Sequence, residues 1–358
     1  MDDRETCRTA FRNRLGAAML GALTAGFAML AALTMAKAQD TKQVNIYSYR
    51  EPGLINPLLE AFTKKTGIKT NVVYASAGLN ERLAAEGQNS PADLLFTVDA
   101  GRLSEAKDAG LTQPVTLPAL TANIPASYRD PGNHWFGLTM RARVVYAHKD
   151  RVKQKTITYE ELADPKWKGK ICTRSGQHVY NTSLLATIIA HKGEAAAEAW
   201  LKGLKANLAR KPTGGDREQV RDVEAGQCDL ALGNTYYMGL MLADPKQKAW
   251  AESVNILFPN AADRGTHVNI SGMALSKYAP NKANALQLME FLASDEAQGI
   301  YAHANNEYPV SPKVEPSAIV KGWGKLKADA LPLENIAKYR KRASELMDKV
   351  GYDAGPGT

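Results

Sequence analysis

Three tyrosines stand where their phenol groups could bind a small, highly charged cation. Tyr236 and Tyr237 are adjacent, and Tyr180 follows Cys172 by the same number of residues as Tyr236 follows Cys228. Phenol oxygens are hard ligands, which favour hard cations. A free tyrosine has a pKa near ~10, so phenolate ligation requires a strong Lewis acid such as Fe(III). Three phenolates would also balance the three positive charges of that ion.

Two other classes of function remain open at this point. The tyrosines could instead pack in a cleft against a small organic cation, such as thiamine or a polyamine, or near an oxyanion. A third hypothesis is an enzyme, which would need a nucleophile with its base or a free reactive cysteine. The sequence contains no G-x-S-x-G, no Walker lysine loop and no H-E-x-x-H, so the common enzyme signatures are missing and we expect no catalysis.

The N-terminus has the pattern of a secretory signal. Basic residues (Arg8, Arg12 and Arg14) precede an apolar run over 15–35, which ends at the A-x-A motif of residues 36–38. We predict a signal peptide over residues 1–38 and a periplasmic mature protein. The alternative is an uncleaved membrane anchor, because the apolar run is nearly long enough to span a bilayer.

The cysteines fit an exported protein. Of the three cysteines, Cys7 belongs to the predicted signal peptide, which leaves Cys172 and Cys228. An even pair in an oxidising compartment predicts a disulfide. Two lone thiols at this separation do not form a zinc pattern.

Strand and helix patterns alternate through the first part of the mature chain. Apolar alternation predicts strands over 44–49, 69–74 and 92–97, and helical spacing predicts helices from Leu54 to Phe62 and from Leu79 to Glu86. A long strand is expected over 134–148. Further on we expect strands at 170–173, 228–232 and 268–275, a helix over 216–226, and one long helix to about Leu204, capped by Asn181 or Thr182.

This order predicts an α/β protein of two lobes, a type II periplasmic-binding clamshell. Each lobe would be a mostly parallel sheet flanked by helices, and two crossing strands would join the lobes. The first lobe would take residues 39–138 and 272–358, and the second would take 139–271 with the tyrosines. Ligands of such sheets bind beyond the carboxyl ends of the strands, here in the cleft between the lobes.

Composition and charge place few further limits on function. The 358-residue chain is 44% apolar and 23% charged, and its formal net charge is +8. Acidic and basic residues alternate along the chain, as in Asp216-Arg217-Glu218. A nucleic-acid-binding protein would instead gather basic residues with interleaved aromatics, so no nucleic-acid partner is expected.

Four stretches resemble one known family. They are residues 46–50 (IYSYR), 90–95 (SPADLL), 141–146 (RARVVY) and 233–237 (GNTYY). The chain resembles the bacterial periplasmic ferric-ion-binding proteins of the FbpA/FutA type, in the transferrin-like type II solute-binding group, over the whole mature length. The resemblance implies that Tyr180, Tyr236 and Tyr237 bind Fe(III). It also implies delivery to an ABC permease and its ATPase, to which a monomer would dock.

The sequence departs from the family at the end of the first strand. Some relatives carry His-Tyr directly after the first-strand arginine, and both residues bind iron; here those positions are Glu51 and Pro52. The resemblance therefore implies three tyrosine ligands, with the remaining positions filled by a synergistic anion such as carbonate or bicarbonate, or by water. Arg141 and Arg50 are the candidates to hold that anion, because a guanidinium can donate two parallel hydrogen bonds. Either arginine could instead form a salt bridge.

Two residues near this point keep two possible roles each. Glu51 could bind the metal or act as a charge at a helix start. Tyr49 could be an extra ligand or a wall of the cleft.

Overall fold

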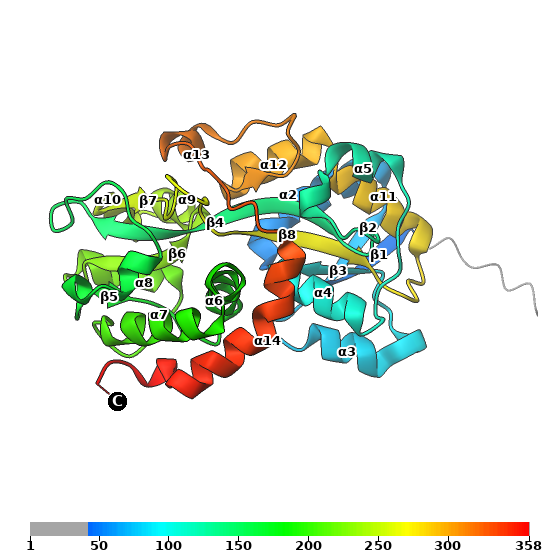
Figure 1. The fold of residues 1–358 in the computed structure, drawn as a ribbon. Coiled ribbons are helices and arrows are strands. Elements are labelled where there is room, and N and C mark those ends of the chain that lie inside the picture. Colours follow the sequence, from blue (N-terminus) through cyan, green and yellow to red (C-terminus); the bar gives the residue numbers. More distant parts are fainter. Residues whose placement is uncertain (1–41, 358) are drawn as a thin grey trace, which may run out of the picture. The chain divides into compact units, whose positions relative to one another are not determined.

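The structure is a computed structural model that describes residues 42–357 (Figure 1). From Gln43 onward the chain forms one compact unit. The predicted signal peptide, residues 1–38, lies outside the described residues. Within residues 42–357, no helix is both long and apolar enough to cross a membrane.

The strands of this unit form one mixed sheet. Their order is β2-β1-β3-β8-β4-β6-β5, and β7 and β9 each pair with β4 beside this path. The strands are β1 (Gln43–Ser48), β2 (Lys69–Tyr74), β3 (Leu94–Thr97), β4 (Phe136–His148), β5 (Ile171–Cys172), β6 (Leu230–Asn234), β7 (Val254–Leu257), β8 (Val268–Leu275) and β9 (Tyr308–Pro309).

Helices cover this sheet. They are α2 (Pro52–Thr66), α3 (Leu79–Glu86), α4 (Ala100–Asp108), α5 (Pro118–Asn123), α6 (Val179–Lys192), α7 (Glu194–Ala206), α8 (Asp216–Glu224), α9 (Tyr236–Ala243), α10 (Lys248–Glu252), α11 (Lys282–Leu292), α12 (Asp295–Asn305), α13 (Ala318–Gly322) and α14 (Leu333–Val350). The mixed α/β class predicted from the sequence is confirmed.

The prediction of mostly parallel sheets holds only in part. β1 pairs in parallel with β2 and β3, and β5 pairs in parallel with β6. Every pairing of β4 and β8 is antiparallel. These two strands run side by side through the middle of the sheet in opposite directions, and Figure 1 shows β4 extending across the molecule from β7 toward β3. Antiparallel neighbours therefore dominate the centre.

The turn from β1 into α2 is set by local sequence. Pro52 occupies the first helical turn, where its missing N–H costs nothing, and its fixed φ suits a helix start. The buried Ile55, Leu58 and Phe62 lie at helical spacing, and the helix ends where Gly67 adopts a left-handed conformation. This geometry leaves residues 49–51 at the carboxyl end of β1.

The long helix predicted up to Leu204 is two helices. α6 and α7 are separated by Gly193, whose φ of 78° a helix cannot contain. The predicted cap is also wrong, because His178 precedes α6 and its side chain accepts a hydrogen bond from the backbone N–H of Tyr180. The helix therefore begins early enough to place Tyr180 in its first turn.

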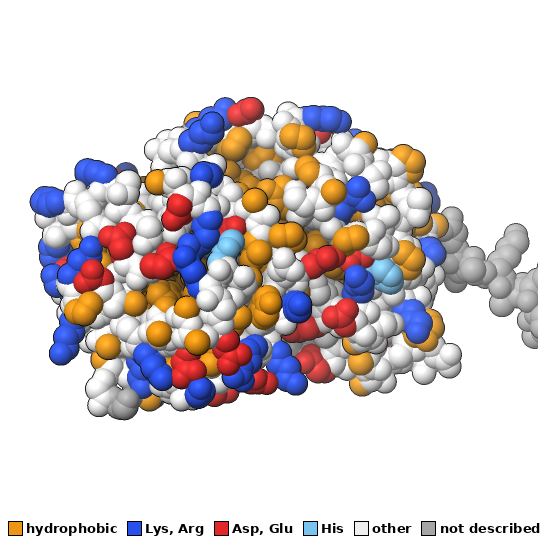
Figure 2. All heavy atoms as spheres, in the orientation of Figure 1, with side chains coloured by type: hydrophobic (Ala, Val, Ile, Leu, Met, Phe, Trp, Pro, Cys, Tyr) orange, Lys and Arg blue, Asp and Glu red, His pale blue; other side chains and the backbone are white. Residues whose placement is uncertain are grey.

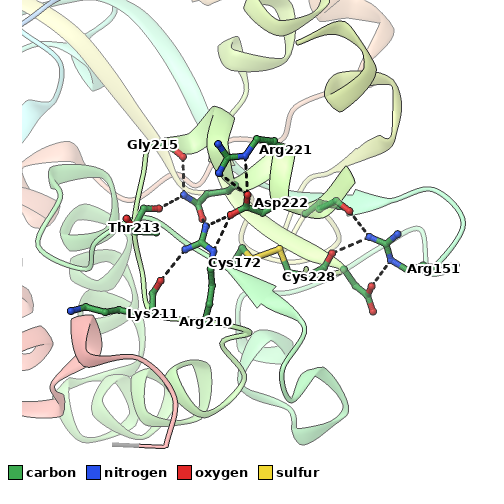
Figure 3. The surroundings of a disulfide bond; sticks show 12 residues. Arg151, Cys172, Arg210, Lys211, Thr213, Gly215, Arg221, Asp222 and Cys228 are labelled. Atoms are coloured by element: carbon green, nitrogen blue, oxygen red, sulfur yellow. Dashed lines mark hydrogen bonds and ion pairs between the residues drawn. A yellow bond between two sulfur atoms is a disulfide. The ribbon is translucent and has the colours of Figure 1, made fainter. Parts of the chain in front are cut away.

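The predicted disulfide between Cys172 and Cys228 is present. Its two Cα atoms are 5.9 Å apart, and it joins the end of β5 to the segment that leads into β6. Figure 3 shows polar contacts on both sides of it: Arg210 forms an ion pair with Asp222, and Arg151 Nη2 donates a hydrogen bond to the Cys228 carbonyl at 3.0 Å. The disulfide thus ties β5 to the segment that leads into its parallel neighbour β6.

Two groups of buried side chains show how the helices pack. Ile46 and Phe96 of the sheet pack with Phe62 of α2 and Leu288 of α11. Leu185 of α6 and Leu201 of α7 pack with Leu346 of α14 in a separate cluster. The predicted lobe boundaries stay a prediction. Helix α14, which the prediction assigns to the first lobe, lies against α6 of the predicted second lobe and also contacts α4.

Candidate functional site

The tyrosines meet at one edge of the sheet. β5 and β6 are parallel neighbours, so the helices that follow them begin at the same edge. Tyr180 lies in the first turn of α6, while Tyr236 and Tyr237 open α9. The Tyr180 and Tyr236 hydroxyl oxygens are 3.3 Å apart, and the Tyr236 and Tyr237 ring centroids are 4.2 Å apart. Three phenol groups are thus gathered at one place, and two of their hydroxyls are within hydrogen-bonding distance of each other.

These phenols face a polar cavity of about 190 Å³. Across it from α6 and α9 lie residues 49–51, at the start of α2, and Tyr74, the last residue of β2. Tyr74 was missed by the sequence reasoning. Its signal was available, because β2 runs parallel to β1 and Ser48 pairs with Tyr74, so both strands end at the cavity.

Burial keeps Tyr236 and Tyr237 protonated. Burial raises the pKa of Tyr236 well above its usual value, and the neighbouring Tyr180 and Tyr237 raise it further. Burial also raises the pKa of Tyr237, and Tyr180 and Asp216 raise it further. Two neighbouring phenolates would repel one another in this dry environment. Ionisation of these groups therefore requires a cation between them.

A buried ion-pair network stabilises the end of the strand that leads into the tyrosine pair. The Asp216 carboxylate, at the start of α8, lies 2.5 Å from Arg143 Nη1 and 3.4 Å from Arg174 Nη1. It also accepts the backbone N–H of Asn234, the last residue of β6, at 2.9 Å. Burial raises the pKa of Asp216, but the two arginines lower it overall. The ionised carboxylate thus fixes the end of β6, where the tyrosine pair begins.

His178 orients Tyr180. Its Nδ1 accepts the Tyr180 backbone N–H at 3.3 Å, and its ring meets the Tyr180 ring edge-on at 4.5 Å. Burial lowers the pKa of His178 to about 3, and Arg174 adds to the shift. The neutral ring with an accepting Nδ1 carries its proton on Nε2. His178 lines the cavity as a neutral group.

Arginines dominate the charge of the cavity. The five that line it are Arg50, Arg102, Arg141, Arg174 and Arg217. Arg102 lies 3.9 Å from Asp99, and Arg174 pairs with Asp216. Sequence reasoning singled out Arg50 and Arg141 only, because the others follow no motif and come from distant helices or loops.

Arg141 has an unused edge. Its side chain is 2% exposed, and its Nη1 donates to Ser271 Oγ at 3.0 Å. Its Nε and Nη2, the pair that forms one edge of a guanidinium, have no hydrogen-bond partner within residues 42–357. No carboxylate pairs with it there either. Because buried donors without partners cost free energy, this edge is suited to receive an anion from the cavity.

Arg50 differs from the expectation of a free anion-binding cation. Its guanidinium forms a buried ion pair with Glu307 and also donates to Ser271 Oγ. Burial lowers the pKa of Arg50, but Glu307 raises it overall. For Arg50, the structure thus shows the alternative role that the sequence left open, a salt bridge. Glu307, which neutralises Arg50, lies so far along the chain that no local pattern could have indicated it.

Tyr49 and Glu51 both line the cavity but have different surroundings. The Tyr49 hydroxyl accepts the backbone N–H of Asn80 at 2.7 Å, and the Arg102 guanidinium lies 4.1 Å from its ring centroid. Its phenol is therefore directed to the start of α3. Glu51 is exposed at the N-terminus of α2, and its side chain makes no capping hydrogen bond. Its carboxylate is free to turn toward the cavity.

Comparison with known families identifies this chain's relatives. Residues 89–322 match the family model described as bacterial extracellular solute-binding protein. Iron uptake protein A1 of Synechocystis is 44% identical over 317 residues, which cover 87% of this chain and 88% of the relative.

Solved structures give the same result. The apo ferric ion-binding protein A of Pasteurella haemolytica is 52% identical and superposes with a TM-score of 0.85, over 87% of this chain and 98% of the other. A Trichodesmium protein, solved in complex with iron and citrate ligands, is 44% identical with a TM-score of 0.82. That likeness covers 87% of this chain and 99% of the other.

Proposed function

We propose a mechanism of iron capture for this chain, which belongs to the ferric-iron-binding group of the bacterial extracellular solute-binding proteins. Members of this group bind a solute and do not catalyse a reaction. The chain is accordingly a ferric-iron-binding protein of an uptake system, and Fe(III) is its cargo. The finer proposal concerns which side chains hold the ion and what accompanies it.

Tyr180, Tyr236 and Tyr237 bind the Fe(III) ion in this proposal. The observation that carries it is their convergence, with two hydroxyl oxygens 3.3 Å apart at the edge of an arginine-lined cavity. A trivalent cation lowers the pKa of the phenols that it contacts, so each proton leaves as its bond to iron forms. Three phenolates then neutralise the ion, which limits the cost of holding it in a buried site.

A synergistic anion completes the coordination. We assign carbonate or bicarbonate to the unused edge of Arg141, because Nε and Nη2 can donate two parallel hydrogen bonds to a planar anion. The charges favour this assignment. Of the five lining guanidinium groups, those of Arg50, Arg102 and Arg174 pair with Glu307, Asp99 and Asp216, whereas no carboxylate of residues 42–357 pairs with Arg141. Arg50 keeps a supporting role, because Glu307 already balances its charge.

Delivery follows from the family, and its details are proposals. The mature protein would bind iron in the periplasm after removal of residues 1–38. Lobes of residues 39–138 with 272–358, and of residues 139–271, would close around the ion by bending in β4 and β8. An ABC permease with its ATPase would then accept the loaded monomer.

A visible absorption titration tests the proposal. Iron-free mature protein titrated with Fe(III) in bicarbonate should develop a phenolate-to-iron charge-transfer band that saturates at one equivalent. The Tyr236→Phe/Tyr237→Phe variant should lose this band, whereas the control Tyr278→Phe, an exposed tyrosine outside the cavity, should keep it. A band of full intensity in the double variant would refute the ligand assignment.

A further inference from the structure

A second cavity lies away from the tyrosines. It has a volume of about 550 Å³, and it is lined by side chains of β4, β9, α13 and the segment after α13. None of its lining residues belongs to the arginine-lined cavity. In Figure 2, hydrophobic side chains are exposed over the region where Figure 1 places α12 and α13. We define this second cavity as the rear cavity.

The rear cavity and the arginine-lined cavity lie on opposite faces of one ladder. Met140 of β4 pairs with Tyr308 of β9, and both line the rear cavity. The next residue along β4 is Arg141, and the residue before Tyr308 is Glu307, which pairs with Arg50. Because successive side chains of a strand point to opposite faces, the ladder separates the two cavities by one residue step.

The wall of the rear cavity is fixed to the body of the protein. The segment after α13 pairs with the residues that precede β8: Thr266 N donates to the Lys327 carbonyl at 2.8 Å, and Asp329 N donates to the Thr266 carbonyl at 2.9 Å. Ala328, between these two contacts, lines the cavity. Val320 of α13 is 1% exposed, so this side of the wall is also packed. The cavity is therefore a built feature of the fold.

Its lining favours an aromatic body. Two tyrosine rings, Tyr128 and Tyr308, face the cavity with Met140, and further apolar surface comes from Leu326. Aromatic rings prefer offset or edge-on contacts with other rings, and a methionine sulfur adds a favourable contact. A volume of this size is in the range of ordinary small-molecule sites.

Two polar groups favour a negatively charged head. Tyr308 is only 7% exposed, and its hydroxyl has no hydrogen-bond partner within residues 42–357. Burial raises the pKa of this phenol, so it remains a donor. At the rim Lys321 is paired with Glu315 at 3.2 Å, but Lys325 is exposed and no acidic residue of the described chain pairs with it. The rim thus keeps one unbalanced positive charge.

We propose that the rear cavity is a second ligand site, which takes a small aromatic carboxylate. The aromatic body would lie between Tyr128, Met140 and Tyr308, and the carboxylate would accept a hydrogen bond from the Tyr308 hydroxyl and pair with Lys325. This site is independent of iron. Its ligand would touch Met140 and Tyr308, whose neighbours in the chain hold the anion side of the iron site.

Calorimetric titration of the purified mature protein with 2-naphthoate tests this site. We expect one equivalent to bind, with the same affinity when Fe(III) is present and in the Tyr236→Phe/Tyr237→Phe variant. Tyr308→Phe should weaken binding about tenfold through loss of a hydrogen bond to a charged group. Lys325→Glu should weaken it about fivefold, as expected of an exposed ion pair. The neutral analogue 2-naphthamide should bind more weakly than the acid.

Matched controls are Lys168→Glu and Tyr278→Phe, which exchange the same groups outside the rear cavity and should leave binding unchanged. Because Tyr308→Phe removes only an unpaired hydroxyl, its melting temperature should not fall, so weak binding cannot be ascribed to unfolding. Three outcomes would each overturn the proposal. They are no binding to the wild type, wild-type affinity in both Tyr308→Phe and Lys325→Glu, and loss of binding in the iron-site double variant. The last outcome would place the acid in the iron site instead.

Discussion

At the scale of single residues, two arginines of β4 show how the same side chain serves two purposes. Arg141 and Arg143 are each 2% exposed and are two positions apart on one strand. Arg143 has a carboxylate partner, Asp216, and stabilises the end of β6. Arg141 has no such partner in the described chain and keeps one edge unused. In our proposal, Arg143 has a structural role and Arg141 holds the anion.

This contrast predicts opposite effects on stability. Arg141→Met should raise the free energy of unfolding of the iron-free protein by about 1–2 kcal/mol, because it removes buried donors that lack partners. Arg143→Met should lower it by about 3–5 kcal/mol, because it leaves Asp216 without its main partner. Urea unfolding of both variants measures these changes. A loss of stability in Arg141→Met as large as in Arg143→Met would contradict an unused edge.

His267 makes stability depend on pH. Its ring is fully buried with Nδ1 2.8 Å from Thr187 Oγ1, and burial, with Arg143 and Arg141 nearby, lowers its pKa to about 3. The unfolded chain binds a proton near the ordinary pKa of about 6.5, whereas the folded protein does not. Folding stability is therefore complete above that pH and falls between pH 6.5 and 3, by about 1.4 kcal/mol per pH unit for this residue.

Urea unfolding at intervals from pH 7 to pH 4 measures this dependence. His267→Gln should flatten the slope by about the contribution of one proton. The control His303→Gln, an exposed residue of α12, should leave the slope unchanged. Equal slopes in the wild type and His267→Gln would show that His267 takes up its proton in the folded protein.

At the scale of elements, the carboxyl ends of β5 and β6 position the tyrosines, and the disulfide ties these strands together. The bond closes a loop with a sequence separation of 56 residues, and a loop of this length gives about 4 kcal/mol in the chain-entropy model. Cys172→Ala/Cys228→Ala should therefore lose about 2–4 kcal/mol of unfolding free energy. Loss of less than about 1 kcal/mol would mean that the packing of β5 alone holds Tyr180 in place.

Much of this arrangement could be predicted from the sequence. Period-two and helical spacing gave the order of β1, α2, β2, α3 and β3, and equal offsets from the two cysteines indicated that the tyrosines share an edge. Local sequence patterns could not predict contacts between residues that lie far apart in the chain. Glu307 and Ser271 meet Arg50 from far along the chain, and no spacing rule predicts that pairing. His178 was missed as a cap because histidine is not among the residue types preferred at a helix N-cap, whereas Asn and Thr are.

At the scale of the whole molecule, the central strands determine how the protein could move. β4 and β8 run through the middle of the sheet, with the arginine-lined cavity and the rear cavity on its two sides. Helix α14 contacts both α6 and α4, and its Arg340 lies 2.9 Å from Glu105 of α4. Figure 1 shows this helix crossing the lower edge of the molecule. If the lobes close around iron, α14 must therefore move together with one of its two partners, α6 or α4, or shift along the other.

Closure predicts a change in size. Addition of Fe(III) with bicarbonate should lower the radius of gyration measured by small-angle X-ray scattering. Arg141→Met should reduce this change, because the anion would then lose its two donors. Arg340→Ala removes the ion pairs of α14 with Asp99 and Glu105, neither of which lines the cavity, and it should enlarge the iron-free protein only. An iron-independent radius in the wild type would contradict closure by hinge bending.

The central claim is that three tyrosines hold the iron, and a crystal structure of the iron-loaded protein with anomalous diffraction at the iron absorption edge tests it most directly. The account predicts one anomalous peak in the arginine-lined cavity, bonded to the phenolate oxygens of Tyr180, Tyr236 and Tyr237, with a small anion between the iron and Arg141. A peak bonded to carboxylates alone, or lying outside that cavity, would contradict the account.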